Sequence, residues 1–205
     1  MSVDFTNSDI LNMDRIERLK LINSIAGIRN VNLIASKSKN NISNLSIFSS
    51  VTHIGSNPAL MSFISRPSNE VKRDTMNNIK EHPYFTINSV EKSKLKNAHL
   101  TSGKYHSDLS EFKICGFKES YIGDFPVPFV LSSRVKIGLK VTETINIKSN
   151  DTILVIGRIE QLNICKDYLI KSKDDNIGVI GLNTYYGITK KAEFEYVRVD
   201  ENKSS

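Results

Sequence analysis

The sequence has no tryptophan, only two cysteines and only four histidines among its 205 residues. Cys115 and Cys165 lie in no CxxC motif and have no histidine at ligand spacing, and no HxxxH or HExxH pair occurs. These absences argue against a metal site. We interpret the cysteines as small buried apolar residues, with a nucleophilic role as the alternative.

The two common nucleotide-binding motifs are also missing. Neither GxGxxG nor GxxxxGK(S/T) occurs, which excludes a Rossmann or P-loop phosphate site. Any phosphate must therefore be held by side chains and a helix end. The sequence also lacks an apolar run of about 18 residues, and residues 1–13 are polar and acidic. We expect no membrane span, no signal peptide and a cytoplasmic location.

The composition is that of an ordinary soluble protein, with 39% hydrophobic and 24% charged residues. The net charge of +6 indicates either a solvated basic surface or an anionic ligand, and we expect no nucleic-acid partner. A chain of 205 residues can bury one sizeable core. We therefore interpret residues 1–205 as a single domain with its core at about 15–198.

The most informative segment is residues 43–51, where the side chains alternate with the period of two that is typical of a half-buried strand. One face carries Leu45, Ile47, Ser49 and Val51, and the other carries Asn44, Ser46, Phe48 and Ser50. The second face offers an amide, two hydroxyls and one aromatic ring. Such a mixture suits a planar polar ligand.

A predicted anion site follows along the chain. Residues 59–66 form an expected strand that ends at Arg66. Residues 74–81 form an expected helix that Asp74 caps, and Lys72 lies just before it. A hydroxyl-bearing strand, a cation at a strand end and a basic residue beside a helix N-terminus together favour the binding of an anion.

The other segments predict a β-barrel with peripheral helices. An amphipathic helix at 14–26 is expected to cover the sheet, and a turn at 37–41 joins a strand at 31–36 to the central segment. Because long strands follow one another after residue 129 without helices between them, a parallel βαβ sheet is not supported. The remaining segments are expected strands at 84–90 and 152–162, a long strand or strand pair at 129–141, a loop at 53–58, a weak helix at 92–102, an irregular segment at 105–123, a turn at 144–151, a charged linker at 166–176 and a closing strand at 194–199.

An ordered series of short motifs resembles the flavin reductase-like family, whose members are FMN-binding split barrels and include flavoredoxin. The resemblance covers about residues 15–198, and it rests on the order of the motifs, since no single one is specific. They are Asn44 to Ser50, Pro58, Phe63, Arg66, Asp74 to Ile79, Phe85 to Asn88, Tyr105, Glu111-Phe112, Gly116-Phe117 and Gly181 to Tyr186.

The resemblance implies a mainly β fold, a six-stranded antiparallel split β-barrel with peripheral helices, in a homodimer that holds one FMN at each end of the subunit interface. It also implies roles for the matching residues. Asn44, Ser46, Phe48 and Ser49 would line the isoalloxazine ring, partly through backbone groups; Ser50, Arg66, Lys72 and Thr75 would surround the ribityl chain and phosphate; Tyr105 and Tyr185 would approach the ring, from the same chain or from the partner; Asp74, Asn77 and Asn78 would cap and stiffen their helix.

Several of these residues have a structural alternative. Phe48 and Phe63 could belong to the core, and Arg66 could end in a surface salt bridge. His99 and His106 are candidates for contacting the ring or supplying a proton, with a plain surface role as the alternative. We name no catalytic residue, because a flavin carries the hydride chemistry itself.

The family implies transfer of hydride or electrons between NAD(P)H and flavin. The basic residues beside the hydroxyl-rich strand favour a single terminal phosphate, and hence FMN over FAD. Two departures from the family pattern matter. The Gly- and His-containing segment by which some members hold nicotinamide is not recognisable. The turn at 38–43 lacks a glycine, and Asn40 or Asn41 can adopt the left-handed conformation instead.

Two functional hypotheses therefore remain open. The first, which we prefer, is an NAD(P)H-dependent flavin oxidoreductase. The second is a flavoredoxin-like electron carrier or flavin-storage protein that is reduced by a partner protein and has no NAD(P)H site of its own.

Overall fold

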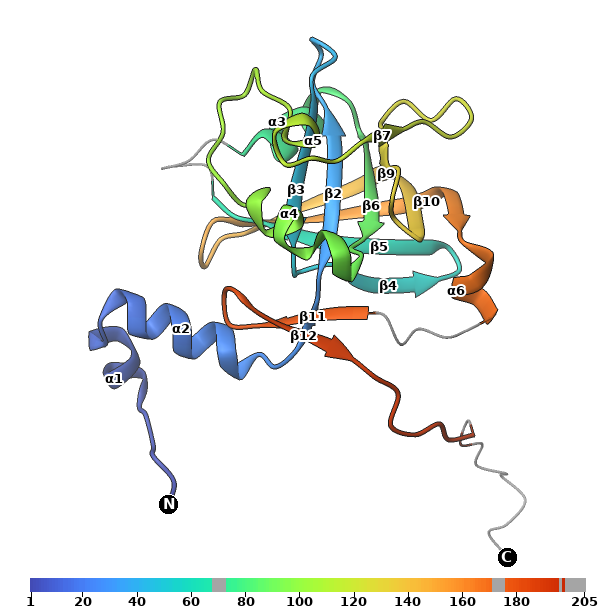
Figure 1. Cartoon of the computed structure of the whole chain (residues 1–205). Helices are drawn as coiled ribbons and strands as arrows, with labels where there is room; N and C mark the ends of the chain where they lie inside the picture. The colour runs from blue at the N-terminus through green and yellow to red at the C-terminus, as the bar shows by residue number, and fades with distance from the viewer. Residues whose placement is uncertain (68–72, 171–175, 196, 198–205) are drawn as a thin grey trace, which may run out of the picture.

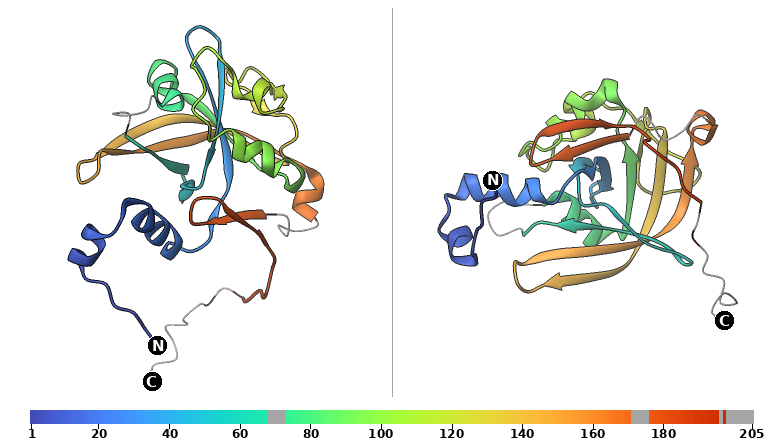
Figure 2. Two further views of the ribbon diagram at one scale, coloured as in Figure 1. Left: turned by 60° about the vertical axis from the view of Figure 1, so that its left-hand side comes forward. Right: turned by 90° about the horizontal axis from the view of Figure 1, so that it is seen from below.

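The structure, a computed structural model, describes residues 1–67, 73–170, 176–195 and 197. Its main element is an antiparallel sheet of seven strands that curves into a barrel (Figures 1 and 2). The strands are hydrogen-bonded in the order β3-β2-β6-β9-β10-β5-β4. They are β2 (Asn32–Lys37), β3 (Ser43–Phe48), β4 (Thr52–Ser56), β5 (Ala59–Ser65), β6 (Tyr84–Ser89), β9 (Val135–Ile147) and β10 (Thr152–Ile164). The predicted mainly β, antiparallel barrel is confirmed.

The number of strands differs from the predicted six because the segment expected to be a loop at 53–58 contains β4. This strand is exposed along most of its length, and β5 is its only partner among the described strands. A register shift between His53 and Gly55 interrupts the pairing. An exposed edge strand with a glycine and an irregular register shows no clean alternation of apolar residues, so its sequence reads as a loop.

A second, smaller sheet lies beside the barrel and is made of strands from both ends of the chain (Figure 1). It contains β1 (Arg29–Asn30), β11 (Asn176–Ile180) and β12 (Thr184–Ile188) in the order β1-β11-β12. The prediction that residues 194–199 close the sheet is wrong where it can be compared, because residues 194, 195 and 197 form no strand. Residues 196, 198 and 199 lie outside the described residues.

The other elements are short. The helices are α1 (Asn7–Asn12), α2 (Arg15–Ile25), α3 (Asp74–Glu81), α4 (Leu95–Leu100) after a 3₁₀ turn at Lys92–Lys94, α5 (Glu111–Ile114) and α6 (Lys166–Ile170). Strands β7 (Glu119–Ser120) and β8 (Phe129–Val130) form a separate pair. The segment 129–141, which we expected to be a long strand or a strand pair, is divided between β8 and β9. β9 continues to Ile147, which shortens the expected turn at 144–151 to residues 148–151. None of the described helices is long and apolar enough to cross a membrane.

Strand β2 is buried on both faces and separates two hydrophobic clusters. Its Ile34 points into the barrel and packs with Phe63, Phe85 and other side chains. Its Leu33 and Ala35 point to the other side, where the cluster extends to helices α4 and α5 and to the small sheet. This alternation follows the pleat of a strand, and it fixes the helices and the small sheet against the outside of the barrel next to β3.

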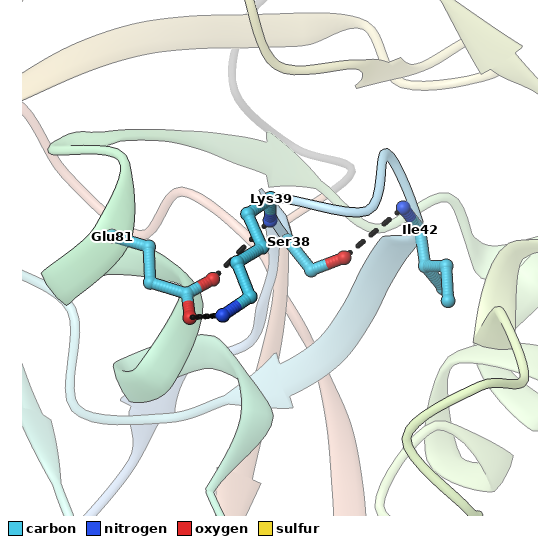
Figure 3. Close-up of polar contacts among 4 residues, drawn as sticks. All are labelled: Ser38, Lys39, Ile42 and Glu81. Carbon is cyan, nitrogen blue, oxygen red and sulfur yellow. Dashed lines mark hydrogen bonds and ion pairs between the residues drawn. The ribbon is translucent and has the colours of Figure 1, made fainter.

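The hairpin between β2 and β3 is closed by a turn whose tip is tied to helix α3 (Figure 3). Ser38 N donates to Ile42 O (3.0 Å), and Ile42 N donates to Ser38 Oγ (3.1 Å). Asn41 has a φ of 63°, as predicted for Asn40 or Asn41. Lys39 N donates to Glu81 Oε2 (3.2 Å), and Lys39 Nζ lies 3.8 Å from Glu81 Oε1. The last residue of α3 is therefore fixed to the hairpin.

Helix α2 begins as predicted but does not cover the sheet. Asp14 caps it by accepting hydrogen bonds from Ile16 N and Glu17 N. None of its residues is buried, and Ile16, Leu19, Ile22 and Ile25 are exposed. The helix projects to one side of the barrel (Figures 1 and 2). The apolar spacing along this helix thus predicts the helix correctly and its packing partner wrongly.

Candidate functional site

A cleft of about 940 Å³ lies between the open edge of β3, the start of α3, residues 99–107 and the small sheet. All but one of the predicted cofactor ligands line this cleft. They are Asn44, Ser46, Phe48, Ser49, Ser50, Arg66, Thr75, Tyr105 and Tyr185. The remaining one, Lys72, lies outside the described residues. The structure thus brings together, in one place, residues that stand up to 141 positions apart in the sequence (from Asn44 to Tyr185).

Strand β3 contributes its backbone edge to the cleft. Ser46 and Ile47 both line it although they point to opposite faces of the sheet. Among the described strands, β3 pairs only with β2, so its other edge carries backbone groups that no neighbouring strand pairs. Leu45 N uses this edge to donate to Glu111 Oε2 (3.0 Å). Because N–H directions alternate along an edge strand, the N–H of Ile47 points to the same side, toward the cleft.

Glu111, at the start of α5, is a buried carboxyl beside this edge. It is only 8% exposed and lines the cleft. Burial raises the pKa of Glu111 and Asp74 adds to the rise, while the hydrogen bond from Leu45 N opposes it. The carboxyl therefore satisfies one backbone donor of the edge at an electrostatic cost.

Helix α3 is held against the barrel by two buried amides. Asn44 Nδ2 donates to Thr75 Oγ1 (3.1 Å), and Asn78 Nδ2 donates to Ser36 Oγ (3.1 Å). Since Thr75 accepts from Asn44, its own hydroxyl proton remains for another acceptor. The prediction that Asp74 caps this helix is wrong: Arg73 occupies the N-cap position without a side-chain cap, and Asp74 is the first helical residue.

Two arginines stand at the entrance to α3. Arg66 follows β5, Arg73 precedes the helix, and both line the cleft. Burial lowers the pKa of Arg73, and the charge of Arg66 lowers it further. The Arg73 side chain is fixed by a hydrogen bond from Nε to Pro67 O (3.3 Å). Two like charges held this close repel each other, and an anion bound between them would relieve the repulsion.

Ser50 has a structural role in closing the barrel. Its Oγ donates to Ile64 O (3.3 Å) and accepts from Ile64 N (3.1 Å). These bonds connect the segment after β3 with β5, at the split between the ends of the sheet. A ligand that bound this hydroxyl would have to displace them, so we assign Ser50 to the frame of the site.

Phe48 belongs to the core and to the cleft. Its ring packs edge-to-face on Phe63, with the centroids 5.1 Å apart, and Phe63 packs in the same way on Phe85. Phe63 is fully buried and does not line the cleft, so its core alternative holds. Phe48 remains partly exposed and lines the cleft.

The far wall of the cleft carries the predicted aromatic and histidine residues. Tyr185 Oη lies 2.8 Å from His99 Nδ1, and the two rings meet edge-to-face. Tyr105 Oη donates to Leu100 O (3.2 Å) and accepts a weak hydrogen bond from Cys115 Sγ (3.8 Å). His106, which also lines the cleft, pairs with Asp108 at its exposed rim (2.6 Å).

Neither cysteine lines the cleft. Cys115 is buried behind Tyr105, as predicted, whereas Cys165 is exposed and not the buried residue that we expected. Among the described residues, no group of three His, Cys, Asp or Glu side chains could hold a metal ion.

Comparison with known proteins agrees with the resemblance. Residues 28–174 match the family described as "Flavin reductase like domain". The chain belongs to this flavin reductase-like family. No curated protein matches.

Solved structures extend the family match over nearly the whole chain. One is a candidate flavin reductase with a split barrel domain from Shewanella frigidimarina NCIMB 400 (TM-score 0.88, 35% identity, 96% of this chain and 100% of that one). Two others share the fold at lower identity. They are 2-nitrobenzoate 2-nitroreductase of Pseudomonas fluorescens (0.78, 19%, 99% and 99%) and flavoredoxin of Desulfovibrio vulgaris Miyazaki F (0.66, 15%, 87% and 93%).

Four charged residues of this cleft were not assigned to the site from the sequence. Arg73 stands beside Lys72 and the helix start, where its basic side chain was a usable signal. Glu111 was noticed only as part of a motif. Arg29 lies on a two-residue strand, and Lys104 lies in a segment without regular structure. For these last two, no periodicity in the sequence indicates which way the side chain points.

Proposed function

We propose that the cleft binds FMN and that the protein is a flavoprotein oxidoreductase, which exchanges hydride or electrons between NAD(P)H and flavin. The observation that carries the proposal is the pair Arg66 and Arg73 beside the start of α3, at one end of a cleft whose wall is an open strand edge. A cation pair at a helix N-terminus suits a terminal phosphate. An open edge with N–H groups suits the polar rim of a planar ring.

The donor set fits FMN in particular. Arg66, Arg73 and the free hydroxyl proton of Thr75 would hold one phosphate. The backbone of β3 from Asn44 to Ser49 would lie along the ring, with Phe48 as its apolar contact. A volume of about 940 Å³ lies within the range of ligand pockets and leaves room for a second small molecule.

Bound FMN would supply the hydride and electron chemistry of its ring. The residues of the chain would hold and orient the ring. Glu111 fixes the β3 edge through Leu45 N. The bonds of Asn44 to Thr75 and of Asn78 to Ser36 fix helix α3, whose start would hold the phosphate, to strands β3 and β2. Space for a second molecule beside the β3 edge favours the reductase over the electron-carrier alternative, which needs no such space.

We further propose that the protein acts as a homodimer whose partner subunit helps to close the cleft. Helix α2 stands beside the cleft, to which its Asn23 contributes, and presents Ile16, Leu19, Ile22 and Ile25 to solvent. Several large apolar side chains exposed on one short helix are typical of an interaction surface. In a homodimer with two-fold symmetry, this surface of α2 would pack on the second subunit.

Two experiments test the function. Acid release of the chromophore from the purified protein should yield FMN, whereas recovery of FAD, or no binding on reconstitution, contradicts the cofactor assignment. Anaerobic stopped-flow mixing of the FMN-loaded protein with NADH and with NADPH should bleach the flavin absorbance. Reduction by neither nucleotide would favour the electron carrier.

A further inference from the structure

A row of three side chains crosses the small sheet and faces the cleft. Arg29 of β1 lies directly opposite Val179 of β11, which lies directly opposite Tyr185 of β12. Directly opposed residues of neighbouring strands project to the same face, and all three line the cleft. Two strand spacings place the Cα atoms of Arg29 and Tyr185 roughly 10 Å apart. Val179, which is nearly buried, lies between them.

The charge of Arg29 is not neutralised by any described residue within ion-pair distance. One terminal nitrogen, Nη2, donates to Gly181 O (2.6 Å) in the β11–β12 turn. Nε is buried and has no hydrogen-bond partner among the described residues. A guanidinium that is fixed, partly desolvated and unpaired projects a positive potential into the cleft. Lys104 adds a second positive charge from the segment that faces the small sheet.

The other end of the row is a rigid aromatic wall. The hydroxyl of Tyr185 is hydrogen-bonded to His99 Nδ1, and the two ring centroids lie 5.8 Å apart at an interplanar angle of 83°. Burial raises the pKa of Tyr185, so the phenol stays neutral. His99 thus fixes the Tyr185 ring through two contacts, and the ring offers an apolar face and a hydroxyl.

We propose that this row is a subsite for the small molecule that exchanges electrons with the flavin. That molecule is planar and carries an anionic group, a carboxylate or a phosphate, which Arg29 binds while Tyr185 contacts its ring. The inference rests on the proposed function, because it names the class of substrate for the same cleft. The cleft then has two separate cationic sites. Arg66 and Arg73 bind the phosphate of FMN, and Arg29 binds the anionic group of the molecule that exchanges electrons with the flavin.

A pair of probes that differ in charge tests the subsite directly. Calorimetric titration of the FMN-loaded protein with 2-nitrobenzoate and with the uncharged 2-nitrobenzamide should give a preference of about tenfold for the anion. Arg29→Gln keeps an amide donor for Gly181 O but removes the charge, so it should abolish this preference. Arg29→Lys should keep most of it. Arg158→Gln, an exposed arginine on β10 outside the cleft, serves as the control.

The same variant distinguishes the two sources of the anion. If Arg29→Gln weakens only the binding of 2-nitrobenzoate, the subsite binds the carboxylate of an electron acceptor. If it weakens only NADH, measured from the concentration dependence of anaerobic flavin reduction, the subsite takes a phosphate of the donor. Unchanged binding of both, or equal affinity of the wild type for the two nitro compounds together with unchanged NADH binding, overturns the proposal.

Failure of the subsite and failure of the proposed function remain separable. Arg29→Gln should leave the dissociation constant of FMN unchanged, and a parallel loss of FMN would show that Arg29 supports the fold of the site instead. If the wild type binds no FMN, the proposed function fails. In that case the subsite is tested without flavin, because the row of side chains is the same in the flavin-free protein. 2-Nitrobenzoate is titrated into the flavin-free wild type and into the flavin-free Arg29→Gln variant.

Discussion

Replacement of Glu111 should separate its hydrogen bond from its charge. Glu111→Ala removes the acceptor of Leu45 N and leaves that N–H buried without a partner. An unsatisfied buried donor costs about 1–3 kcal/mol. For a chain of this length, that corresponds to a fall in Tm of roughly 2–12 °C. Glu111→Gln keeps an acceptor oxygen in place, so it should avoid this loss.

The charge should appear in the pH dependence. A raised pKa means that the folded protein binds the proton more tightly than the unfolded chain does. The ionised carboxyl therefore destabilises the fold above the folded pKa. This destabilisation disappears as the pH falls toward the ordinary glutamate pKa of about 4.3. Glu111→Gln should be at least as stable as the wild type at pH 8, and its advantage should shrink on acidification.

Urea unfolding of the wild type and both variants between pH 4.5 and 8 measures these differences, with Glu143→Gln on the exposed part of β9 as the control. Two results would refute the reasoning. One is an alanine variant as stable as the wild type, which would mean that Leu45 N does not depend on this acceptor. The other is a difference between Glu111→Gln and the wild type that stays constant with pH.

Three other substitutions or measurements follow from the same contacts. Arg66→Ala should weaken FMN binding by about one to two decades, since a charge-assisted contact contributes about 1.5–3 kcal/mol, and should leave riboflavin binding unaffected. Fluorescence titration measures both affinities, with Arg158→Ala as the control. Equal losses for both ligands would show that Arg66 does not act on the phosphate. Ser50→Ala should lower the unfolding free energy in urea by about 1–2 kcal/mol, because Ile64 loses two hydrogen bonds across the split; Ser149→Ala in the exposed turn should change nothing, and an equal effect of the two would contradict the assignment. Sedimentation should give about twice 23.1 kDa, with flavin lost as the dimer dissociates, and a stable monomer that retains stoichiometric FMN would contradict the dimer.

The parts of the fold that the sequence predicted are those in which burial imposes a period. β3 and β6 carry apolar residues at alternate positions, and β2 carries a continuous apolar run, because their faces pack on the two clusters. β4 was missed because it is an exposed edge that packs on little. The packing partner of α2 was predicted wrongly for a related reason: apolar residues at helical spacing show that a surface tends to be covered, but do not show by what.

The candidate site was predicted unevenly for the same physical cause. Side chains of β3 could be placed because a strand alternates, and the ordered family motifs indicated Arg66, Thr75, Tyr105 and Tyr185. The roles within that set depend on tertiary contacts. The hydroxyl of Ser50 is engaged by Ile64, and Glu111 reaches Leu45 across 66 positions. Arg29 enters the cleft only through the register of the small sheet, which no local pattern records.

The most direct measurement of the central claim compares FMN with riboflavin. The two ligands share the ring and the ribityl chain and differ only in the phosphate, which we assign to Arg66, Arg73 and Thr75. Titration of the flavin-free protein with each, followed by quenching of flavin fluorescence, should show FMN binding more tightly by about one to two decades. The preference should shrink as salt is added, because it is electrostatic. Equal affinities for the two flavins, or no binding of either, would contradict the account.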